Sequence, residues 1–319
     1  MNEDELVRRI RGVFSERIGD DAAVIGNLVA TTDMLVEDVD FTRDTPPQFI
    51  ARKSLAVNLS DLAAMGATPS WALASFALPE WFTPYLDPFL EALASAARDY
   101  KIEIVGGDLS RSAVLVISIV ACGTIATRPL LRSGARPGDR IYLSRPVGGA
   151  SAGLTLLRGG WTLTGAPPQP VGYAAVEFAR SAIRRQLDPE PELALGSALA
   201  DVPQVSACID VSDGLSTDLQ RLCEASRCGA EIERERIPVF PDLLGSSAAL
   251  GIHVRDAVLH GGEELALLFT SSLHESELSA RVGRPVYRIG RMVPGEGVVL
   301  REEGVAKVLE PGGWDHFRF

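Results

Sequence analysis

The spacing of apolar residues changes several times along the first half of the chain. Between residues 4 and 14, Leu6, Ile10 and Phe14 recur every four positions, which is typical of one face of a helix. The segment from about 46 to 65 begins with a proline and is followed directly by a glycine, the usual boundary residues of a helix. Both segments are therefore predicted to be helical.

Short apolar runs between these helices predict strands. We expect strands at 22–25, 28–32, 71–78, 102–105 and 114–125, with a further helix at 86–100. The longest apolar stretch, 113–126, is interrupted by Ser118 and Thr124 and is too short for a membrane helix. It is interpreted as a buried strand.

A turn rich in Gly and Pro at 132–139 divides the two halves of the pattern. Beyond it we expect strands at 140–144 and 205–211, helices starting near 149 and at 171–186, 192–200 and 214–226, and a loop at 162–172. The chain has 319 residues, which is long for one α/β core. The prediction is an α/β (α+β) protein with domains at 1–137 and 138–319.

Composition and charge narrow the function classes. Hydrophobic residues make up 46% of the chain and charged residues 23%, as in ordinary soluble globular proteins. The formal charge of −11 argues against a broad nucleic-acid surface, which needs clustered Lys and Arg. The first residues mix charges without an apolar run, so no signal peptide is expected. To bind an anionic substrate, this negatively charged chain would need a local source of positive charge, such as divalent cations held by carboxylates.

The cysteines indicate a reducing compartment. They are Cys122, Cys208, Cys223 and Cys228, and none forms a CxxC pair. Cys122 and Cys208 lie in apolar, strand-like runs, where a reduced core thiol is the expected role. We therefore expect a cytoplasmic protein without a zinc site.

Aspartates beside glycines or near strand ends are the most informative residues. They fall in five segments: GDDA (19–22), TTD (31–33), NLSD (58–61), GGD (106–108) and DVSDG (210–214). Each segment alone has an ordinary structural explanation, as a turn, a helix cap or a solvated helix face.

Two of these aspartates lie in apolar surroundings, which favours a shared chemical role. Asp61 is on a helix that is otherwise mostly apolar, and Asp33 precedes the apolar Met34 and Leu35. Partly buried carboxylates need partners, and few basic residues are nearby in sequence. Because Mg²⁺ prefers oxygen ligands and bridges carboxylates to phosphates, the pattern predicts a magnesium-dependent phosphate site.

The familiar phosphate-binding motifs are absent from the sequence. It contains neither a GxxxxGK[ST] loop nor the HRD and DFG motifs of protein kinases. A Gly-rich segment at 145–153 leads into a predicted helix, whose backbone N–H groups could receive phosphate. Tight packing between strand and helix is the simpler explanation for these glycines.

Taken in order, these segments and several others resemble the thiamine-monophosphate kinase family, part of a larger group of ATP-using enzymes related to aminoimidazole ribonucleotide synthetase. The matching segments are GDDAAV (19–24), TTDMLVEDVDF (31–41), AVNLSDLAAMGATP (56–69), VGGDLSRS (105–112), RSGARPGDRIYLS (132–144), DVSDGLSTDL (210–219), GGEELALLFT (261–270) and GWDHF (313–317). They cover nearly the whole chain.

The resemblance implies an architecture and a reaction. The N-terminal domain should hold a mixed sheet with helices and should pair with a second copy in a homodimer. The C-terminal α/β domain should complete the nucleotide and acceptor site. The implied reaction transfers phosphate from ATP to thiamine monophosphate with several Mg²⁺ ions. A phosphate oxygen is the nucleophile, so no general base is expected.

The resemblance also implies roles for individual residues. The magnesium positions match Asp21, Thr31, Thr32, Asp33, Asp61, Asp108, Asp210 and Asp213. The ATP positions match Tyr100, Gly107, Asp108, Arg132 and Ser212. The substrate positions match Asp40, Glu263 and Trp314.

Two departures from the family pattern both fall on the acceptor side. Asp40 stands where the family usually has His, and the chain reads GGEELALLF at 261–269 where the family usually reads GGEDYELLF. Two alternatives therefore stay open. Beside a thiamine-monophosphate kinase, the alternatives are a kinase or synthetase of the same superfamily with a different acceptor, and a non-catalytic protein that binds nucleotide or thiamine phosphate.

Two particular relatives of that superfamily fit the sequence poorly. A selenophosphate synthetase would have a reactive Cys in an N-terminal Gly-rich segment, whereas the first Cys of this chain is Cys122. The hydrogenase-maturation relative would have a C-terminal Cys, whereas this chain ends in HFRF.

Overall fold

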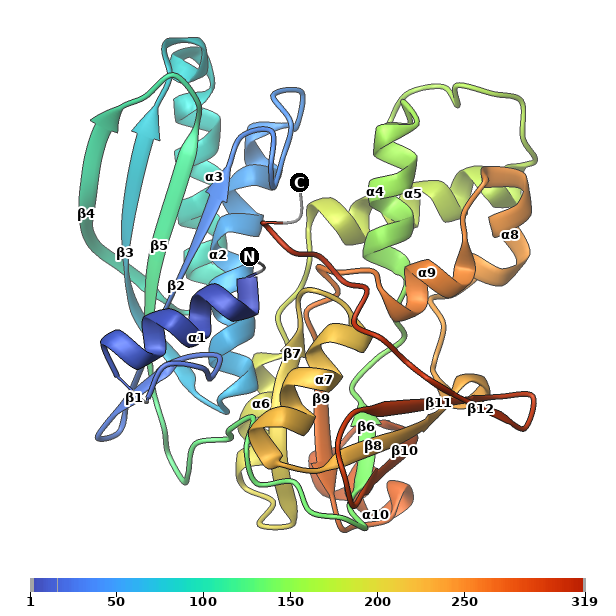
Figure 1. Cartoon of the computed structure of the whole chain (residues 1–319). Coiled ribbons are helices and arrows are strands. Elements are labelled where there is room, and N and C mark those ends of the chain that lie inside the picture. The colour runs from blue at the N-terminus through green and yellow to red at the C-terminus, as the bar shows by residue number, and fades with distance from the viewer. Residues whose placement is uncertain (1–2, 16, 318–319) are drawn as a thin grey trace.

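The computed structural model describes residues 3–15 and 17–317, which form two sheets, each with its own helices (Figure 1). The N-terminal sheet has the strand order β1-β2-β5-β3-β4, and only the β3–β4 pair is parallel. Its strands are β1 (Ala23–Ile25), β2 (Leu28–Val36), β3 (Thr68–Leu78), β4 (Glu103–Arg111) and β5 (Val116–Thr124). This is the mixed sheet that the family resemblance implied.

The helices of this half are α1, α2 and α3, with a short 3₁₀ turn before α3. Their bounds are α1 (Glu3–Val13), α2 (Pro47–Ala64), η1 (Glu80–Tyr85) and α3 (Leu86–Asp99). Helices α2 and α3 cover one face of the sheet (Figure 1). By contrast, α1 has no buried residue.

The C-terminal sheet is larger and also mixed. Its order is β12-β11-β8-β10-β6-β9-β7, and only the β8–β11 pair is parallel. The strands are β6 (Arg140–Leu143), β7 (Val205–Val211), β8 (Gly229–Glu233), β9 (Ala266–Ser271), β10 (Tyr287–Val293), β11 (Val298–Glu302) and β12 (Val305–Val308). The helices are α4 (Gly149–Arg158), α5 (Tyr173–Leu187), α6 (Leu193–Ala200), α7 (Leu215–Ser226), η2 (Arg234–Arg236), α8 (Leu243–Leu250), α9 (Val254–Leu259) and α10 (Glu275–Val282).

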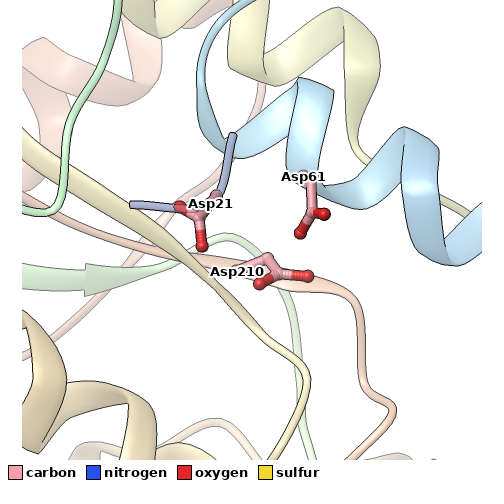
Figure 2. A group of neighbouring side chains, drawn as sticks. All are labelled: Asp21, Asp61 and Asp210. Carbon is pink, nitrogen blue, oxygen red and sulfur yellow. The ribbon is translucent and has the colours of Figure 1, made fainter. Parts of the chain in front are cut away.

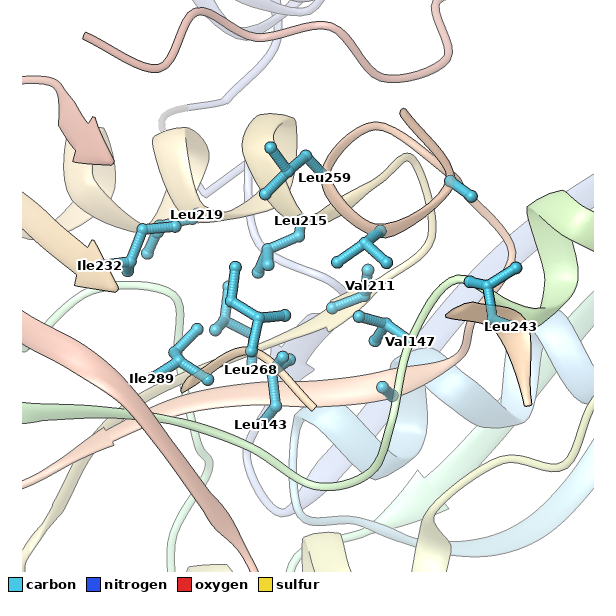
Figure 3. Close-up of a cluster of buried hydrophobic side chains, with 14 of the residues drawn as sticks. Leu143, Val147, Val211, Leu215, Leu219, Ile232, Leu243, Leu259, Leu268 and Ile289 are labelled. Carbon is cyan, nitrogen blue, oxygen red and sulfur yellow. The ribbon is translucent and has the colours of Figure 1, made fainter. Parts of the chain in front are cut away.

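A continuous apolar core stabilises this second half. Figure 3 shows side chains from strands and helices meeting there, among them Leu143, Val211, Leu215 and Leu268, none more than 1% exposed. Burying each such side chain contributes about 1.5–3 kcal/mol.

Helix α2 joins the two halves because it is buried against both. Leu55 and Leu59 belong to the core of the N-terminal sheet, whereas Ala63 packs in a cluster with α6 and β7 of the other half. The backbones of α2 and α6 approach closely at Gly196, where a Cβ would lie 2.0 Å from the carbonyl oxygen of Ala63. Only glycine permits this contact.

Two predicted strands continue past the C-terminal ends that the sequence pattern indicated. The strand expected at 28–32 continues to Val36, so Asp33 lies within β2 and not at its end. The strand expected at 102–105 continues to Arg111, so Gly107 and Asp108 lie within β4 and not after it. In both cases pairing with a neighbouring strand maintains an extended backbone that the local composition does not favour.

Other predictions concern the domain boundary, the state of the cysteines and the absence of membrane-spanning helices. The expected boundary between residues 137 and 138 falls in an irregular connection before β6, and this division stays a prediction. All four cysteines are buried and free. Within the described residues, no helix is both long enough and apolar enough to cross a bilayer.

We predict that Leu59→Ala lowers the free energy of unfolding by about 3 kcal/mol, because Leu59 is fully buried in α2 and its truncation leaves a cavity. Leu244→Ala is the matched control, since Leu244 on α8 is 67% exposed and should change stability by less than about 0.5 kcal/mol. Urea denaturation measures both values. Equal effects of the two substitutions would contradict the central packing role of α2.

Candidate functional site

Three aspartates from distant parts of the chain converge between the two halves. Asp21 lies just before β1, Asp61 on α2 and Asp210 near the end of β7, and one carboxylate oxygen of each lies within 4.8 Å of the others. Figure 2 shows their carboxylates directed toward one another. Asp21 and Asp210 are 7% and 2% exposed, so the cluster is largely removed from water.

Neutral hydroxyl groups hold two of these carboxylates in place. Thr31 Oγ1 donates to Asp61 Oδ2 at 2.5 Å, and Ser60 Oγ donates to Asp210 Oδ2 at 2.5 Å. Neither bond supplies a positive charge. The cluster is therefore positioned by the protein without being neutralised at Asp61 and Asp210.

Asp21 is the member of the cluster with a cationic partner. Arg132 donates from Nε and Nη2 to Asp21 Oδ1, at 3.0 Å and 2.6 Å. The other oxygen, Asp21 Oδ2, is buried and has no hydrogen-bond partner. A buried oxygen without a donor is costly unless a ligand completes its coordination.

Burial and mutual repulsion raise the pKa values in this cluster. Burial, followed by the nearby Asp33, Asp210 and Asp21, raises the pKa of Asp61 well above its usual range. Burial, followed by Asp21, has the same effect on the pKa of Asp210. Because divalent cations favour oxygen ligands and would relieve this repulsion, the donor set fits Mg²⁺.

Asp33 lies beside the cluster on β2. Its backbone N–H donates to Asn58 Oδ1 at 3.0 Å, which ties the strand to α2. Burial, together with Asp40 and Asp213, raises the pKa of Asp33 to about 6. Thr32, by contrast, points to the opposite, exposed face of β2, since side chains alternate along a strand.

The loop after β7 carries Asp213, which pairs with Arg221. Arg221 Nη1 also contacts Asp218 Oδ1 at 3.2 Å. Asp218 Oδ2 accepts the N–H groups of Asp213 and Gly214, at 3.1 Å and 2.9 Å. Asp218, and not Asp213, therefore accepts the N–H groups at the start of α7, whereas the side chain of Asp213 pairs with Arg221.

The predicted ATP positions fall in two separate places. Arg132 and Ser212 adjoin the aspartate cluster, through Asp21 and Asp210 respectively. Asp108 and Gly107 lie on β4, three strands from β2 and thus about 14 Å away. Tyr100 directly follows α3. A single chain therefore does not bring all of the predicted site residues together.

The three predicted acceptor residues border the same region. The N–H of Glu263 donates to Ser212 O at 2.6 Å, and the N–H of Trp314 donates to Asp213 O at 3.0 Å. Asp40 follows β2 and is a direct electrostatic neighbour of Asp33. Segments more than 200 residues apart thus form one polar surface.

The Gly-rich segment before α4 has a structural role. Glu264 Oε1 accepts the N–H groups of Gly148 and Ala150, at 2.8 Å and 2.9 Å. These donors are satisfied by the protein itself and do not serve a bound phosphate. Strand-to-helix packing, the simpler explanation from the sequence, is sufficient.

Several residues at the site were missed from the sequence. Lys53 on α2 is 4% exposed and pairs with Glu263, which also accepts a bond from Gln186. His316 lies close enough to Asp33 and Asp40 to influence both carboxyls. The apolar surroundings of Lys53 were the available indication, because a buried ammonium requires a carboxylate partner.

Comparison with known proteins gives consistent matches along the chain. Residues 19–125 match the family described as AIR synthase related protein, N-terminal domain, and residues 136–302 match the corresponding C-terminal domain. The thiamine-monophosphate kinase of Salmonella typhimurium is 35% identical over 328 residues, covering 98% of this chain and 95% of the relative. That of Aquifex aeolicus is 34% identical over 308 residues, covering 95% and 94%.

A solved structure has the same architecture. It is described as AaThiL complexed with AMPPCP and TMP, and it matches with a TM-score of 0.87 at 32% identity. The match covers 99% of this chain and 97% of that one. The α/β fold with two domains that the sequence predicted is confirmed.

We predict that Asp61→Asn stabilises the metal-free protein by about 1–2 kcal/mol at pH 8, because it removes one charge from a buried, mutually repelling cluster. A carboxyl group whose pKa is raised in the folded state stabilises the protein at pH values below its unfolded-state pKa. This stabilisation is lost as the pH rises through the folded-state pKa. The gain should therefore shrink as the pH is lowered from 8 to 5, because a larger fraction of Asp61 is then protonated.

Urea denaturation with chelator at both pH values measures this effect. Asp108→Asn is the matched control, since Asp108 is exposed on β4 and outside the cluster, and we expect no change with pH. Destabilisation by Asp61→Asn at pH 8 would contradict the repulsive character of the cluster.

Proposed function

The chain belongs to the AIR synthase related family, and we propose that it is an ATP-dependent kinase that converts thiamine monophosphate to thiamine diphosphate. The observation that carries this proposal is the buried cluster of Asp21, Asp61 and Asp210, with an unpartnered oxygen on Asp21. Such a cluster suits a reaction between two polyanions, which repel one another unless cations intervene.

Magnesium is the cation that this donor set fits best. Asp21, Asp61 and Asp210 would hold it, with Asp33 and Asp213 adjoining. When bound, it supplies positive charge that offsets repulsion between the phosphates. All the proposed ligands are carboxylate oxygens, the type that Mg²⁺ prefers.

The protein's own groups position the reactants. Arg132 is held by Asp21 at the edge of the cluster, where its guanidinium suits a nucleotide phosphate. Ser212 lies between Asp210 and Asp213 in the loop after β7. The acceptor phosphate is already anionic near neutral pH, so it needs orientation and not deprotonation.

The acceptor would lie between Asp40, Glu263 and Trp314. Trp314 is 43% exposed, so its ring is accessible for stacking on a cationic heterocycle. The two carboxylates border the same space. This surface supports an acceptor with one positively charged ring and one phosphate.

A homodimer would complete the site. Strand β4 is an unpaired edge nine residues long, and its apolar Val105 and Leu109 are 54% and 71% exposed. Long exposed edges of this kind favour pairing with another chain. Gly107 and Asp108 on this edge would reach the aspartate cluster of a second copy, which would explain why they lie far from the aspartate cluster of their own chain.

A cytoplasmic location accords with the four free, buried cysteines.

We predict that the protein forms ADP from ATP only when both Mg²⁺ and thiamine monophosphate are present. Asp210→Asn should lower turnover about 100-fold or more, the order expected for losing one electrostatic group at a reaction centre. Asp256→Asn, exposed on α9, should leave turnover unchanged. Coupled detection of ADP measures the rates.

The same assay separates the alternatives. ATP turnover that does not depend on thiamine monophosphate would indicate a superfamily member with a different acceptor. Binding of ATP and thiamine monophosphate without ADP formation would indicate a non-catalytic binding protein.

We predict that Leu109→Asp converts a dimer to a monomer and abolishes turnover, because it places a charge on the proposed β4 interface. Leu244→Asp is the control, since Leu244 on α8 has a similar exposure of 67%. Light scattering at micromolar concentration measures the mass of each variant. A monomeric wild-type protein with full activity would refute the dimer.

A further inference from the structure

The negative charge of Glu263 is already compensated within the chain. Its Oε1 pairs with the ammonium of Lys53, and its Oε2 accepts a hydrogen bond from Gln186 Nε2. The side chain of Lys53 is 5% exposed and that of Glu263 is 31% exposed. Both carboxylate oxygens of Glu263 therefore have partners before any acceptor binds.

Asp40 lies beside Glu263 but is not compensated in the same way. Its Oδ2 accepts the N–H of Val36 at 2.8 Å, a neutral donor. Lys53 reaches only the backbone carbonyl of Asp40, at 3.5 Å, and not its carboxylate. Within the described residues no ion pair involves the Asp40 carboxylate, and Lys53 and His316 act on it only as more distant electrostatic neighbours, so the carboxylate remains available to a ligand.

The loop that carries Asp40 is firmly anchored. The carboxylate of Glu37, 3% exposed, accepts the N–H of Leu115 at 2.7 Å and Arg43 Nε at 2.9 Å. This ties the loop to the start of β5. Asp40 is therefore preorganised, which lets a single charge contribute to specificity.

The arrangement orients an acceptor with charges at both ends. Its phosphate belongs with the aspartate cluster and the cation that the cluster would hold. Its ring would then lie near Trp314, whose N–H donates to Asp213 O, and near Asp40, an electrostatic neighbour of Asp33. A positively charged ring placed there would have the Asp40 carboxylate, which forms no ion pair among the described residues, as its counter-charge.

We propose that Asp40, and not Glu263, recognises the positive charge of the acceptor ring, whereas Glu263 and Lys53 form a neutral pair that positions the pocket. This inference rests on the proposed function, because it requires an acceptor bearing a thiazolium. It makes Asp40 a specificity-determining residue at the position where the sequence departs from its family.

The test compares two acceptors that differ only in ring charge: thiamine monophosphate and its neutral isostere with thiophene in place of thiazolium. Calorimetry on the full chain should show that the wild-type protein binds the charged acceptor about tenfold more tightly, equivalent to about 1.4 kcal/mol. Asp40→Asn keeps a side-chain oxygen for the Val36 N–H but removes the charge, so the ratio of the affinities for the charged and the neutral acceptor should fall to about one. Asp40→Glu keeps the charge and should retain most of the preference for the charged acceptor.

Glu263→Gln provides the opposite comparison. It should weaken both acceptors by a similar factor, because Lys53 loses its partner, and leave their ratio unchanged. Asp44→Asn, an exposed carboxylate in the same loop, controls for a general change in charge. ATP affinity, measured separately, reports whether each variant is folded.

The outcomes separate this inference from the proposed function. Three results would overturn the assignment of Asp40. They are a wild-type ratio of charged to neutral acceptor affinity near one, an unchanged affinity ratio in Asp40→Asn, and an affinity ratio that falls to about one in Glu263→Gln. If the wild-type protein neither binds nor phosphorylates thiamine monophosphate, the proposed function fails as well. A purely structural role for Asp40 would weaken both acceptors equally and leave the ratio intact.

Discussion

The buried contact among Asp21, Asp61 and Asp210 is the constraint on which the site depends. Three carboxylates within 4.8 Å repel one another, and burial removes the water that would otherwise screen them. The fold tolerates this arrangement because α2 is fixed between two apolar cores and holds its polar residues in place. Thr31 and Ser60 then supply donors without supplying charge.

The cationic side chains near this cluster are paired with carboxylates at its edge. Arg132 pairs with Asp21, Arg221 pairs with Asp213, and Lys53 pairs with Glu263. Each cation lies at the edge, so Asp61 and Asp210 remain without a cationic partner from the described chain. The overall charge of −11 is therefore no obstacle to binding phosphates, because the electrostatics that matter are local. Divalent cations held at this site would, in the proposed function, attract phosphates in turn.

The two halves of the chain contribute different parts of the chemistry. The N-terminal half supplies Asp21, Asp61 and the loop with Asp40, and the C-terminal half supplies Asp210 and Glu263. Helix α2 carries both Lys53 and Asp61, so the proposed acceptor side and the proposed metal side share one helix. A change in the packing of α2 would therefore affect both sides at once.

The sequence by itself predicted most elements and pointed to the aspartates of the candidate site, because apolar periodicity and aspartates in apolar surroundings are local properties. The exact span of β7 and the location of α2 within one residue followed from such patterns. Only the tertiary structure decided which carboxylates are compensated, because ion pairs join residues far apart in sequence. Glu263 and Asp40 look equivalent as acidic residues, yet Lys53 folds against one carboxylate and only the backbone of the other. Likewise, only the strand order reveals that Asp108 lies three strands from β2, since sheet position depends on pairing and not on local sequence.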